Sequence, residues 1–316
     1  MLKTGLHLII IGYVFGSALA FSNILPLGEY GWFGDLAVHF TPHLAIAGLL
    51  LSCLALIMLK SKRTLYLTLA ITVIHWVTVL TYSNYIKPTE LTSSAAPKLR
   101  LIAFNAWAKP EAINELSKLA KAHNTDVIAI SEMSQASCKD LTVQFPDFTF
   151  CRIAAEASNG QALTKRMALL SKIEPLRYTV LTEPGFRGRG IIDASFPLGE
   201  DNIRLISIHP VAPGSPAHMR DRDNVLRRAA ELLKDEDKFI LAGDMNTTPW
   251  SAIYRQLPGR RIGDARLELT WRLSWHILGL PIDHIQISEN MQLHAYKVGP
   301  NIGSDHRPLI ADVSVK

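Results

Sequence analysis

Three long uncharged stretches dominate the first third of the chain. They run from Leu6 to Leu27, from Ala37 to Leu59 and from Thr64 to Tyr82. Each approaches the roughly 20 residues that a helix needs to cross the hydrocarbon core of a bilayer. A soluble fold would have to bury three such stretches in a core that so short a region does not supply. We therefore predict a membrane anchor over residues 1–82 with about three transmembrane helices.

The first stretch also fits a secretory signal peptide. Lys3 would be its short basic region, and Ala18-Leu19-Ala20 is similar to a small-residue cleavage site. Cleavage after residue 20 and retention as a helix are both open, and both lead to the same topology for the rest of the chain.

Charged residues predict the orientation of the anchor. Lys60, Lys62 and Arg63 lie between the second and third stretches, whereas the connector after the first stretch carries Glu29 and Asp35 and neither Lys nor Arg. The positive-inside rule places the basic connector in the cytoplasm. The third helix then delivers everything that follows to the outer side of the membrane.

From Lys98 onward, short β-rich runs alternate with helical segments. Pro- and Ser-containing residues 83–97 predict a linker, and residues 98–316 predict one layered α/β domain. Strands are expected at 101–104, 127–131, 167–171, 190–196, 203–208, 239–242, 282–287 and 309–315, and helices at 111–123 and 216–234.

Composition narrows the classes of protein. With 48% hydrophobic and 19% charged residues, the chain is not disordered. Only five of its 33 basic and three of its 28 acidic residues precede Lys98, so the predicted domain is nearly neutral. Composition therefore gives little support for a nucleic-acid-binding surface.

The three cysteines exclude a disulfide-rich scaffold and show no spacing typical of structural zinc. An oxidising compartment would favour a disulfide between Cys138 and Cys151. The alternative is two buried thiols that pack as small apolar side chains.

Polar side chains suited to metal or phosphate binding follow most of the predicted strands. Strand ends on one side of a sheet share a crevice, so we expect these side chains to converge. Any one of them has an ordinary structural explanation, and the ordered set carries the prediction. The set comprises Asn105, Glu132, His209, Asp244, Asn246, Asp283, Asp305 and His306.

The oxygen-bearing members suit metal and water. Glu132 and Asn105 offer a carboxylate and an amide oxygen, which are ligands that Mg²⁺ prefers. Asp244 could take a proton from an attacking water that Asn246 holds.

The histidines suit a phosphoryl group. His209 and His306 can donate hydrogen bonds to phosphoryl oxygens as negative charge develops on them. A carboxylate such as Asp283 would keep an imidazole protonated and correctly oriented.

Two arginine pairs are further candidates for anion binding. Arg189 directly precedes a strand and is a candidate phosphate ligand, whereas Arg187 beside it fits a solvated turn equally well. Arg220 and Arg222, in the helix after His209, form another candidate edge.

The chain resembles the endonuclease/exonuclease/phosphatase superfamily over residues 98–316. The resemblance implies a four-layer α/β/β/α sandwich, in which two packed mixed β-sheets are flanked by helices. It also implies metal-dependent cleavage of a phosphodiester, phosphomonoester or pyrophosphate. The matching motifs are Phe-Asn105-Ala-Trp, Ile-Ser-Glu132, Ile-His209-Pro, Gly-Asp244-Met-Asn246, Ile-Asp283-His and Gly-Ser-Asp305-His306-Arg-Pro.

The same resemblance implies residue roles. Asn105 and Glu132 would hold Mg²⁺, with Mn²⁺ as the alternative ion, and Asp305 would be a further metal contact or a support for His306. The catalytic residues would be His209, Asp244, Asn246, Asp283 and His306.

The predicted membrane anchor narrows the range of possible substrates. The architecture resembles membrane-anchored bacterial members of the superfamily associated with glycopeptide resistance, which implies a polyprenyl pyrophosphate or another lipid phosphate. It also implies the bacterial inner (plasma) membrane as location, with the bilayer and a phosphorylated lipid as partners and no obligate protein partner.

Two other functions stay open. The first is an extracytoplasmic Mg²⁺-dependent nuclease, for which Trp250, Trp271 and Trp275 could stack on bases, although they equally fit a core or a rim at the membrane. The second is a module that binds lipid headgroups without turnover. A water-activating Asp beside a metal site argues against such a module.

Overall fold

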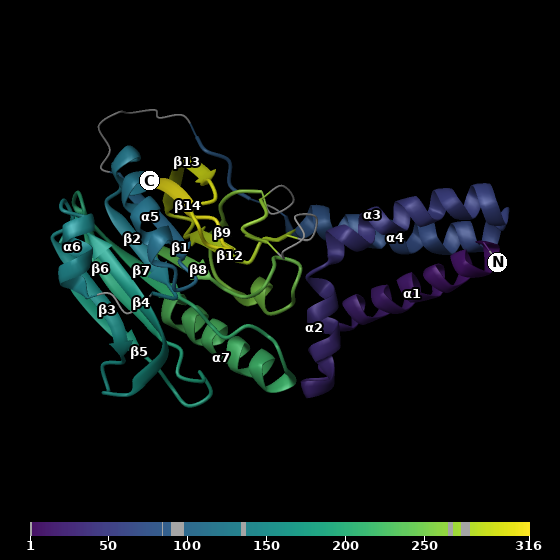
Figure 1. The fold of residues 1–316 in the computed structure, drawn as a ribbon, viewed down its shortest axis with the longest axis horizontal. Helices are drawn as coiled ribbons and strands as arrows, with labels where there is room; N and C mark the ends of the chain where they lie inside the picture. Colours follow the sequence, from purple (N-terminus) through teal and green to yellow (C-terminus); the bar gives the residue numbers. More distant parts are fainter. Residues whose placement is uncertain (1, 84, 90–97, 134–136, 265–267, 273–278) are drawn as a thin grey trace.

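The computed structural model describes residues 2–83, 85–89, 98–133, 137–264, 268–272 and 279–316. Helices α1 (Leu2–Ser22), α3 (Thr41–Leu54) and α4 (Lys62–Tyr82) form a bundle that projects from a β-rich domain (Figure 1). A π-helical segment, η2 (Ala55–Leu59), extends α3. The short 3₁₀ helix η1 (Gly28–Gly31) and helix α2 (Trp32–Val38) connect α1 to α3 and lie at the junction with the domain.

Within the described residues, the domain contains two six-stranded sheets. In spatial order, the first sheet is β13 (Met291–Val298), β14 (Leu309–Val315), β1 (Leu99–Asn105), β2 (Val127–Ser131), β4 (Ala162–Ser171) and β3 (Phe150–Glu156). The second is β5 (Arg177–Leu181), β6 (Ile191–Leu198), β7 (Asp201–Ile208), β8 (Phe239–Asp244), β12 (Asp283–Ile287) and β9 (Arg260–Arg261).

Helices cover the outer faces of both sheets. Helices α5 (Pro110–Ala122) and α6 (Cys138–Gln144) pack on the first sheet, and α7 (Pro216–Leu233) packs on the second. A 3₁₀ turn, η3 (Tyr254–Gln256), and a ribbon of β10 (Trp271–Arg272) and β11 (Gly279–Leu280) complete the elements described. This arrangement confirms the predicted four-layer α/β/β/α sandwich.

Alternation along the strands explains the layers. In β1, Leu101 and Ala103 face the second sheet, whereas Ile102 and Phe104 face α5. Because both faces of this strand are buried, its sequence is apolar throughout and is easily recognised as a strand. The elements missed by the sequence analysis include β5, an edge strand in which only Val180 is buried.

Parallel pairing brings the polar strand ends together. Strands β1 and β2 run parallel, with Asn105 opposite Ser131, and β7 and β8 also run parallel, with Ile208 opposite Gly243. The carboxyl ends of these four strands therefore meet at the same end of the sandwich. Strand β12 runs antiparallel to β8 and places Asp283 opposite the last residue of β8.

Cys138 and Cys151 form a disulfide that joins α6 to β3, as the sequence analysis favoured. The third cysteine, Cys53, is exposed on α3 and is not part of a disulfide.

Three helical segments are long and apolar enough to cross a membrane: Leu2–Ser22, Thr41–Leu59 and Lys62–Tyr82. Two predicted boundaries were wrong. The first helix ends at Ser22, not at Leu27, and Ala37 and Val38 belong to α2 instead of the second membrane stretch. Pro42 lies in the first turn of α3, where its fixed φ favours helix initiation.

The helix bundle has buried polar pairs as well as apolar residues in its interior, and its outer surface is apolar. Tyr13 Oη lies 3.2 Å from Thr72 Oγ1, and His75 Nε2 lies 3.0 Å from Ser17 Oγ, all four between helices. The exposed side chains include many large apolar residues, for example Leu8, Ile9, Phe15, Ile57, Val73 and Val77. Exposed apolar side chains around hydrogen-bonded polar pairs are typical of helices surrounded by lipid.

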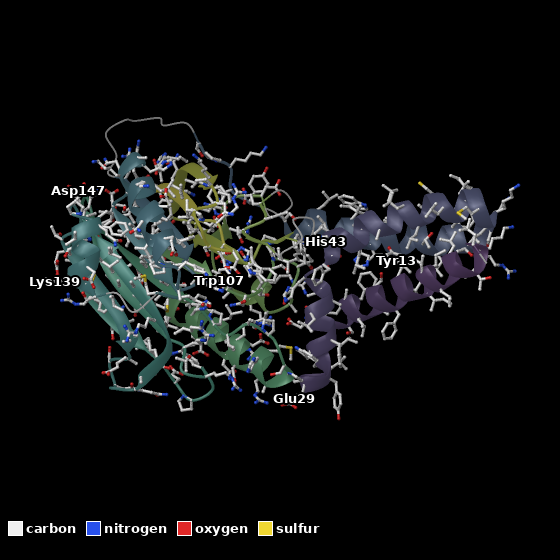
Figure 2. All side chains as sticks on the ribbon, in the orientation of Figure 1. Tyr13, Glu29, His43, Trp107, Lys139 and Asp147 are labelled. Atoms are coloured by element: carbon white, nitrogen blue, oxygen red, sulfur yellow. A yellow bond between two sulfur atoms is a disulfide. The ribbon has the colours of Figure 1, made fainter. Side chains whose placement is uncertain are left out.

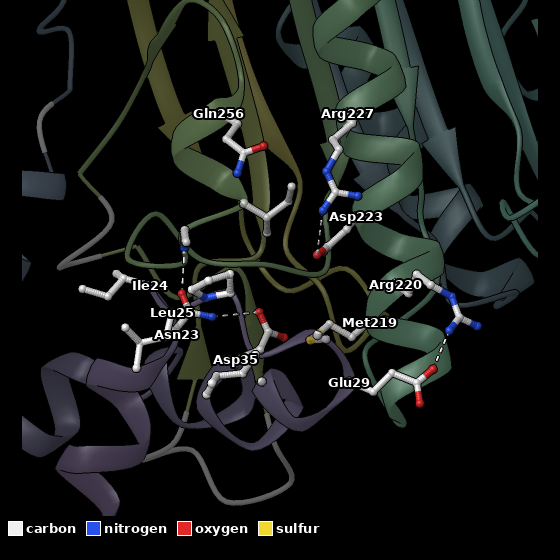
Figure 3. Close-up of a pocket in the computed structure, with 16 residues that line it drawn as sticks. Asn23, Ile24, Leu25, Glu29, Asp35, Met219, Arg220, Asp223, Arg227 and Gln256 are labelled. Atoms are coloured by element: carbon white, nitrogen blue, oxygen red, sulfur yellow. Dashed lines mark hydrogen bonds and ion pairs between the residues drawn. The ribbon is translucent and has the colours of Figure 1, made fainter.

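The connector from α1 to α3 is bound tightly to α7 (Figure 3). Arg222 of α7 makes two hydrogen bonds of 2.8 Å with the carboxylate of Asp35, and Arg220 pairs with Glu29. The expectation that Arg220 and Arg222 form an anion-binding edge is therefore wrong, because acidic residues of the connector occupy both guanidinium groups. The pocket drawn in Figure 3 lies between the connector and α7 and contains none of the predicted catalytic residues.

Part of the predicted linker lies against the domain. The backbone N–H of Ile86 donates to Arg261 O at 3.0 Å, and that of Thr89 donates to Leu293 O at 2.9 Å. Residues 84 and 90–97 of the predicted linker lie outside the described residues.

Candidate active site

The predicted site residues meet in one cavity of about 510 Å³ at the carboxyl ends of the parallel strands. Asp283 lies directly behind the cavity wall, where its carboxylate contacts His306. The predicted residues that line the cavity are Asn105, Glu132, Arg189, His209, Asp244, Asn246, Asp305 and His306.

Asp244, the last residue of β8, is the centre of the polar network. Its carboxylate accepts hydrogen bonds of 2.9 Å from the side-chain amide of Asn105 and from the backbone N–H of Asn246. Its Oδ2 also lies 3.4 Å from His209 Nδ1 and 3.8 Å from His306 Nε2. Burial raises the pKa of Asp244, and the neighbouring histidines oppose that rise.

The turn after β8 depends on two unusual backbone conformations. Gly243 has φ 136°, and a Cβ on it would collide with the carbonyl oxygen of Ile208 on β7. Glycine is therefore required for β7 and β8 to approach so closely. Asn246 has φ 49°, and its side-chain amide donates to Pro210 O at 3.0 Å, which fixes the loop after β8 to the loop after β7.

Glu132 follows β2 in a left-handed backbone conformation with φ 51°. Its Oε2 accepts from Lys165 Nζ at 2.7 Å, and its Oε1 lies 3.1 Å from His209 Nε2. Burial alone would raise the pKa of Glu132, but the hydrogen bonds from His209 and Lys165 lower it to about 2. The side chain is therefore a carboxylate at neutral pH.

His306 and Asp283 form a buried pair. His306 Nδ1 lies 2.8 Å from Asp283 Oδ2, and the backbone N–H of His306 donates to Ser304 Oγ at 3.1 Å. Burial alone would lower the pKa of His306, but the carboxylates of Asp283 and Asp244 raise it to about 10. The imidazole is therefore protonated, and its Nε2 is directed toward Asp244.

The motif that supplies Asp283 also contains His284, whose side chain projects from the opposite face of β12. His284 is completely buried, lies 3.1 Å from Arg261 Nε and 2.9 Å from Thr247 O, and does not line the catalytic cavity. Burial lowers its pKa well below the ordinary value, so this histidine is neutral.

The arginine pair before β6 divides into two roles. Arg187 is bound to Asp221 at 2.8 Å, so it has a structural partner. Arg189 lines the cavity, and its Nε and Nη1 atoms are buried without a hydrogen-bond partner among the described residues. Burial lowers the pKa of Arg189, and the nearby carboxylates of Glu132 and Asp244 oppose that shift. A buried guanidinium with two nitrogen atoms that lack a partner in the described part of the chain is suited to an anionic ligand.

The tryptophans have different surroundings. Trp271 lines the cavity, and its indole N–H donates to Asp305 Oδ2 at 3.0 Å. Trp250 is buried against Val38 and Val79, at the junction with the helix bundle. Trp275 lies outside the described residues.

The sequence analysis missed residues from α2 and its C-terminal end. Leu36, His39 and Phe40 line the cavity opposite the polar strand ends. His39 Nδ1 lies 3.0 Å from Thr248 Oγ1 in the loop after β8. The charged Asp35 and the helix-initiating Pro42 were the nearby signals that this segment does not continue the second membrane stretch. Lys165, the partner of Glu132, had no signal in the sequence.

The donor set of the cavity fits a hard divalent cation. Asn105, Glu132 and Asp305 line the cavity and have side-chain oxygen atoms, which Mg²⁺ prefers as ligands. Atoms of Asp244, Asp283 and His306 also lie within 4.8 Å of one another. In that second group, the hydrogen bond between Asp283 and His306 Nδ1 already explains why the atoms lie so close together, without a metal ion.

We expect Asp283→Asn to lower the pKa of His306 from about 10 toward the ordinary value of 6.5, because it removes the nearest carboxylate. Protonated His306 stabilises the fold below pH 6.5, and this contribution is lost as the pH rises through its folded-state pKa. NMR titration of the imidazole in metal-free protein measures the change. Asp305→Asn is the control, since Asp305 Oδ1 is 4.0 Å from Nε2 and should shift the pKa less. An unchanged pKa in Asp283→Asn would contradict the assignment.

Comparisons with known proteins agree with this fold. A sequence profile of the Endonuclease/Exonuclease/phosphatase family matches residues 102–306. No curated protein sequence gives a significant match. Among solved structures, a humanized TDP2 of D. rerio is 15% identical with a TM-score of 0.56, covering 69% of this chain and 99% of that chain.

Two bacterial structures have the same fold. An endonuclease/exonuclease/phosphatase from Beutenbergia cavernae is 17% identical with a TM-score of 0.55, covering 69% of this chain and 72% of that one. The 3′ phosphatase NExo from Neisseria, bound to a product DNA hairpin, is 16% identical with a TM-score of 0.52, covering 67% and 98%. The family profile covers about two thirds of the chain and includes the cavity residues from Asn105 to His306. The chain therefore belongs to the endonuclease/exonuclease/phosphatase family, whose members hydrolyse phosphoester bonds.

Proposed function

We propose that this protein is a membrane-anchored, divalent-metal-dependent phosphohydrolase that cleaves a phosphoester or pyrophosphate bond of a lipid-linked substrate at the outer membrane surface. One observation carries the proposal. The polar strand ends form one side of the catalytic cavity, and Leu36, His39 and Phe40 of the membrane-proximal connector form another. A substrate in this cavity therefore contacts both the catalytic groups and the segment that leads into the helix bundle.

Several features support membrane anchoring by residues 1–82, with residues 83–97 as linker and 98–316 as catalytic domain. The three long apolar helices expose apolar side chains around an interior in which polar side chains also pair between helices. Lys60, Lys62 and Arg63 lie at the end of the bundle that is remote from the domain, on the same side as the N-terminus (Figure 1). That charge distribution favours a cytoplasmic position for this end and an extracytoplasmic position for the domain. The Cys138–Cys151 disulfide is consistent with an oxidising compartment.

For the cofactor, we propose that Asn105, Glu132 and Asp305 hold Mg²⁺, or Mn²⁺ in its place. The Lys165 side chain now bound to Glu132 is long and 43% exposed, so it can move away when a cation binds. When bound, the ion would neutralise phosphate charge and polarise the phosphoryl group.

For the chemistry, Asp244 accepts a proton from a water that Asn246 helps to position. A raised pKa makes Asp244 a stronger base than an exposed carboxylate. Protonated His306 donates from Nε2 to a phosphoryl oxygen, while Asp283 keeps the ring charged and oriented. His209 assists on the same group, and Arg189 binds a non-bridging oxygen of the phosphate.

The second candidate is a nuclease. Trp107 is 50% exposed at the cavity, and Lys109 Nζ lies 4.8 Å from the centre of its ring. An exposed aromatic ring beside a cation is suited to stacking a base next to a phosphate. The apolar wall formed by Leu36 and Phe40 favours the lipid substrate.

The test uses the full-length protein purified in detergent with Mg²⁺. It is offered a polyprenyl pyrophosphate, a phosphodiester lipid and plasmid DNA, and phosphate release, headgroup release and DNA nicking are measured. We expect hydrolysis of a lipid substrate that EDTA abolishes and added Mg²⁺ restores. DNA cleavage without lipid hydrolysis would replace the proposal with the nuclease. Metal-independent lipid binding without turnover would indicate a binding module.

A further inference from the structure

Another cavity, of about 390 Å³, lies between α3 and the domain. We call it the α3 groove. Its lining residues are apolar except for His43, the single ionisable residue among them, which lies where the helix bundle meets the domain (Figure 2). The lining includes Ile46, Ala47 and Leu50 of α3, and Trp250, Leu280 and Pro281 of the domain.

The α3 groove adjoins the catalytic cavity. Leu280 lines both of them and lies three residues before Asp283. The hydroxyl oxygen of Thr270 accepts hydrogen bonds from the backbone N–H groups of Ile282 at 3.1 Å and Asp283 at 3.0 Å, so the segment is fixed between the two cavities. On the opposite wall, the ring of Phe40 in the catalytic cavity lies 5.6 Å from that of His43 in the groove.

The other end of the groove reaches the surface of the apolar helix bundle. Ile46 and Leu50 are 53% and 61% exposed, and they belong to the helix that is most apolar of the three membrane candidates. From Pro42 to Leu50, α3 rises about 12 Å. The groove therefore extends from the reaction site to the zone where the bilayer hydrocarbon would begin.

We propose that the α3 groove binds the hydrocarbon chain of the substrate while its phosphate occupies the catalytic cavity. This inference rests on the proposed function and adds to it the binding site of the lipid's hydrocarbon chain. A linear hydrocarbon chain fits because the described residues that line the groove are apolar apart from His43. The chain can stay partly in the bilayer, since the groove opens beside Ile46 and Leu50. Chain length beyond the reacting headgroup then contributes to binding.

The test compares two pyrophosphates with the same headgroup, a C55 polyprenyl and a C10 prenyl compound, using the full-length protein in detergent. Ala47→Trp fills the groove, and we expect the C55-to-C10 ratio of kcat/KM to fall about tenfold, because several methylene contacts are lost. Ala47→Leu adds less volume and should give a smaller fall, so the proposal stays testable if the Trp variant does not fold. Leu49→Trp, exposed on the same helix and outside the groove, is the matched control.

The outcomes separate the two proposals. If the wild-type protein hydrolyses neither pyrophosphate nor any other lipid, the proposed function fails. If it hydrolyses C55 and both Ala47 variants keep the wild-type ratio, the α3 groove does not bind the chain and the proposed function stands. A fall in the ratio that is equal in Leu49→Trp also overturns the inference, because it would reflect a general change at the helix surface.

Discussion

Replacing Asp244 by Asn is expected to lower kcat about 10²- to 10⁴-fold, the range for removal of a positioned general base. Asn has nearly the same shape as Asp but does not accept a proton from water. In the structure, the carboxylate also organises its surroundings through hydrogen bonds of 2.9 Å with Asn105 and with the backbone of Asn246. The substitution therefore removes the base and weakens the network that positions the water.

Loss of activity should occur without loss of the fold. Asp244 is buried beside the carboxylate of Asp283, and burial raises its pKa, so its charge is not favourable for stability. We expect the thermal unfolding temperature of Asp244→Asn to equal or exceed that of the wild type. Asp312→Asn is the control, because this half-buried residue pairs with Arg100 and does not line the catalytic cavity. Wild-type kcat in Asp244→Asn would exclude the proposed role.

The second large effect is expected at Arg222. Its guanidinium is completely buried and binds Asp35 twice at 2.8 Å and Asp223 at 2.7 Å. Arg222→Met leaves the buried carboxylate of Asp35 without its cation, which costs about 3 to 5 kcal/mol. For a domain of this size we expect Tm to fall by about 10 °C. Differential scanning fluorimetry of the detergent-solubilised protein measures the change.

Two variants make this test specific to the buried pair. Asp35→Leu combined with Arg222→Met removes both charges, so the double variant should recover much of the stability. Arg220→Met removes an exposed arginine two residues away that pairs with Glu29, and its cost should stay below about 1 kcal/mol. An equal loss of stability in Arg220→Met and Arg222→Met would show that the buried ion pair contributes no more than an exposed one.

The effect also has a defined pH dependence. Burial alone would raise the pKa of Asp35, but His39 and Arg222 lower it well below its ordinary value. A group with a lowered pKa contributes stability above its unfolded-state pKa, and the contribution is lost as pH falls through the folded-state value. The difference between wild type and Arg222→Met should therefore be largest at neutral pH and narrow below about pH 4.

The long apolar helices and most of the sandwich were predictable because their signals are local. Long uncharged stretches predict the helices. Strands buried on both faces, such as β1 and β2, are apolar throughout and are recognised for that reason. Edge strands and short helices were missed, because a half-exposed strand such as β5 has a mixed composition. The alternation of strands and helices in the sequence indicated parallel pairing of short strands. That pairing places the polar strand ends in one cavity.

The sequence by itself determined the hydrocarbon-spanning lengths, the basic end of the bundle and the set of polar residues at strand ends, since each depends on neighbouring residues alone. Tertiary structure decided that Lys165 pairs with Glu132, that Arg222 binds Asp35 and that Phe40 and Leu280 share the catalytic cavity. These contacts join residues far apart in the chain, and many alternative partners have the same charge or hydropathy. Only tertiary packing selects among them, because burial makes an unmatched charge or an unfilled apolar surface costly.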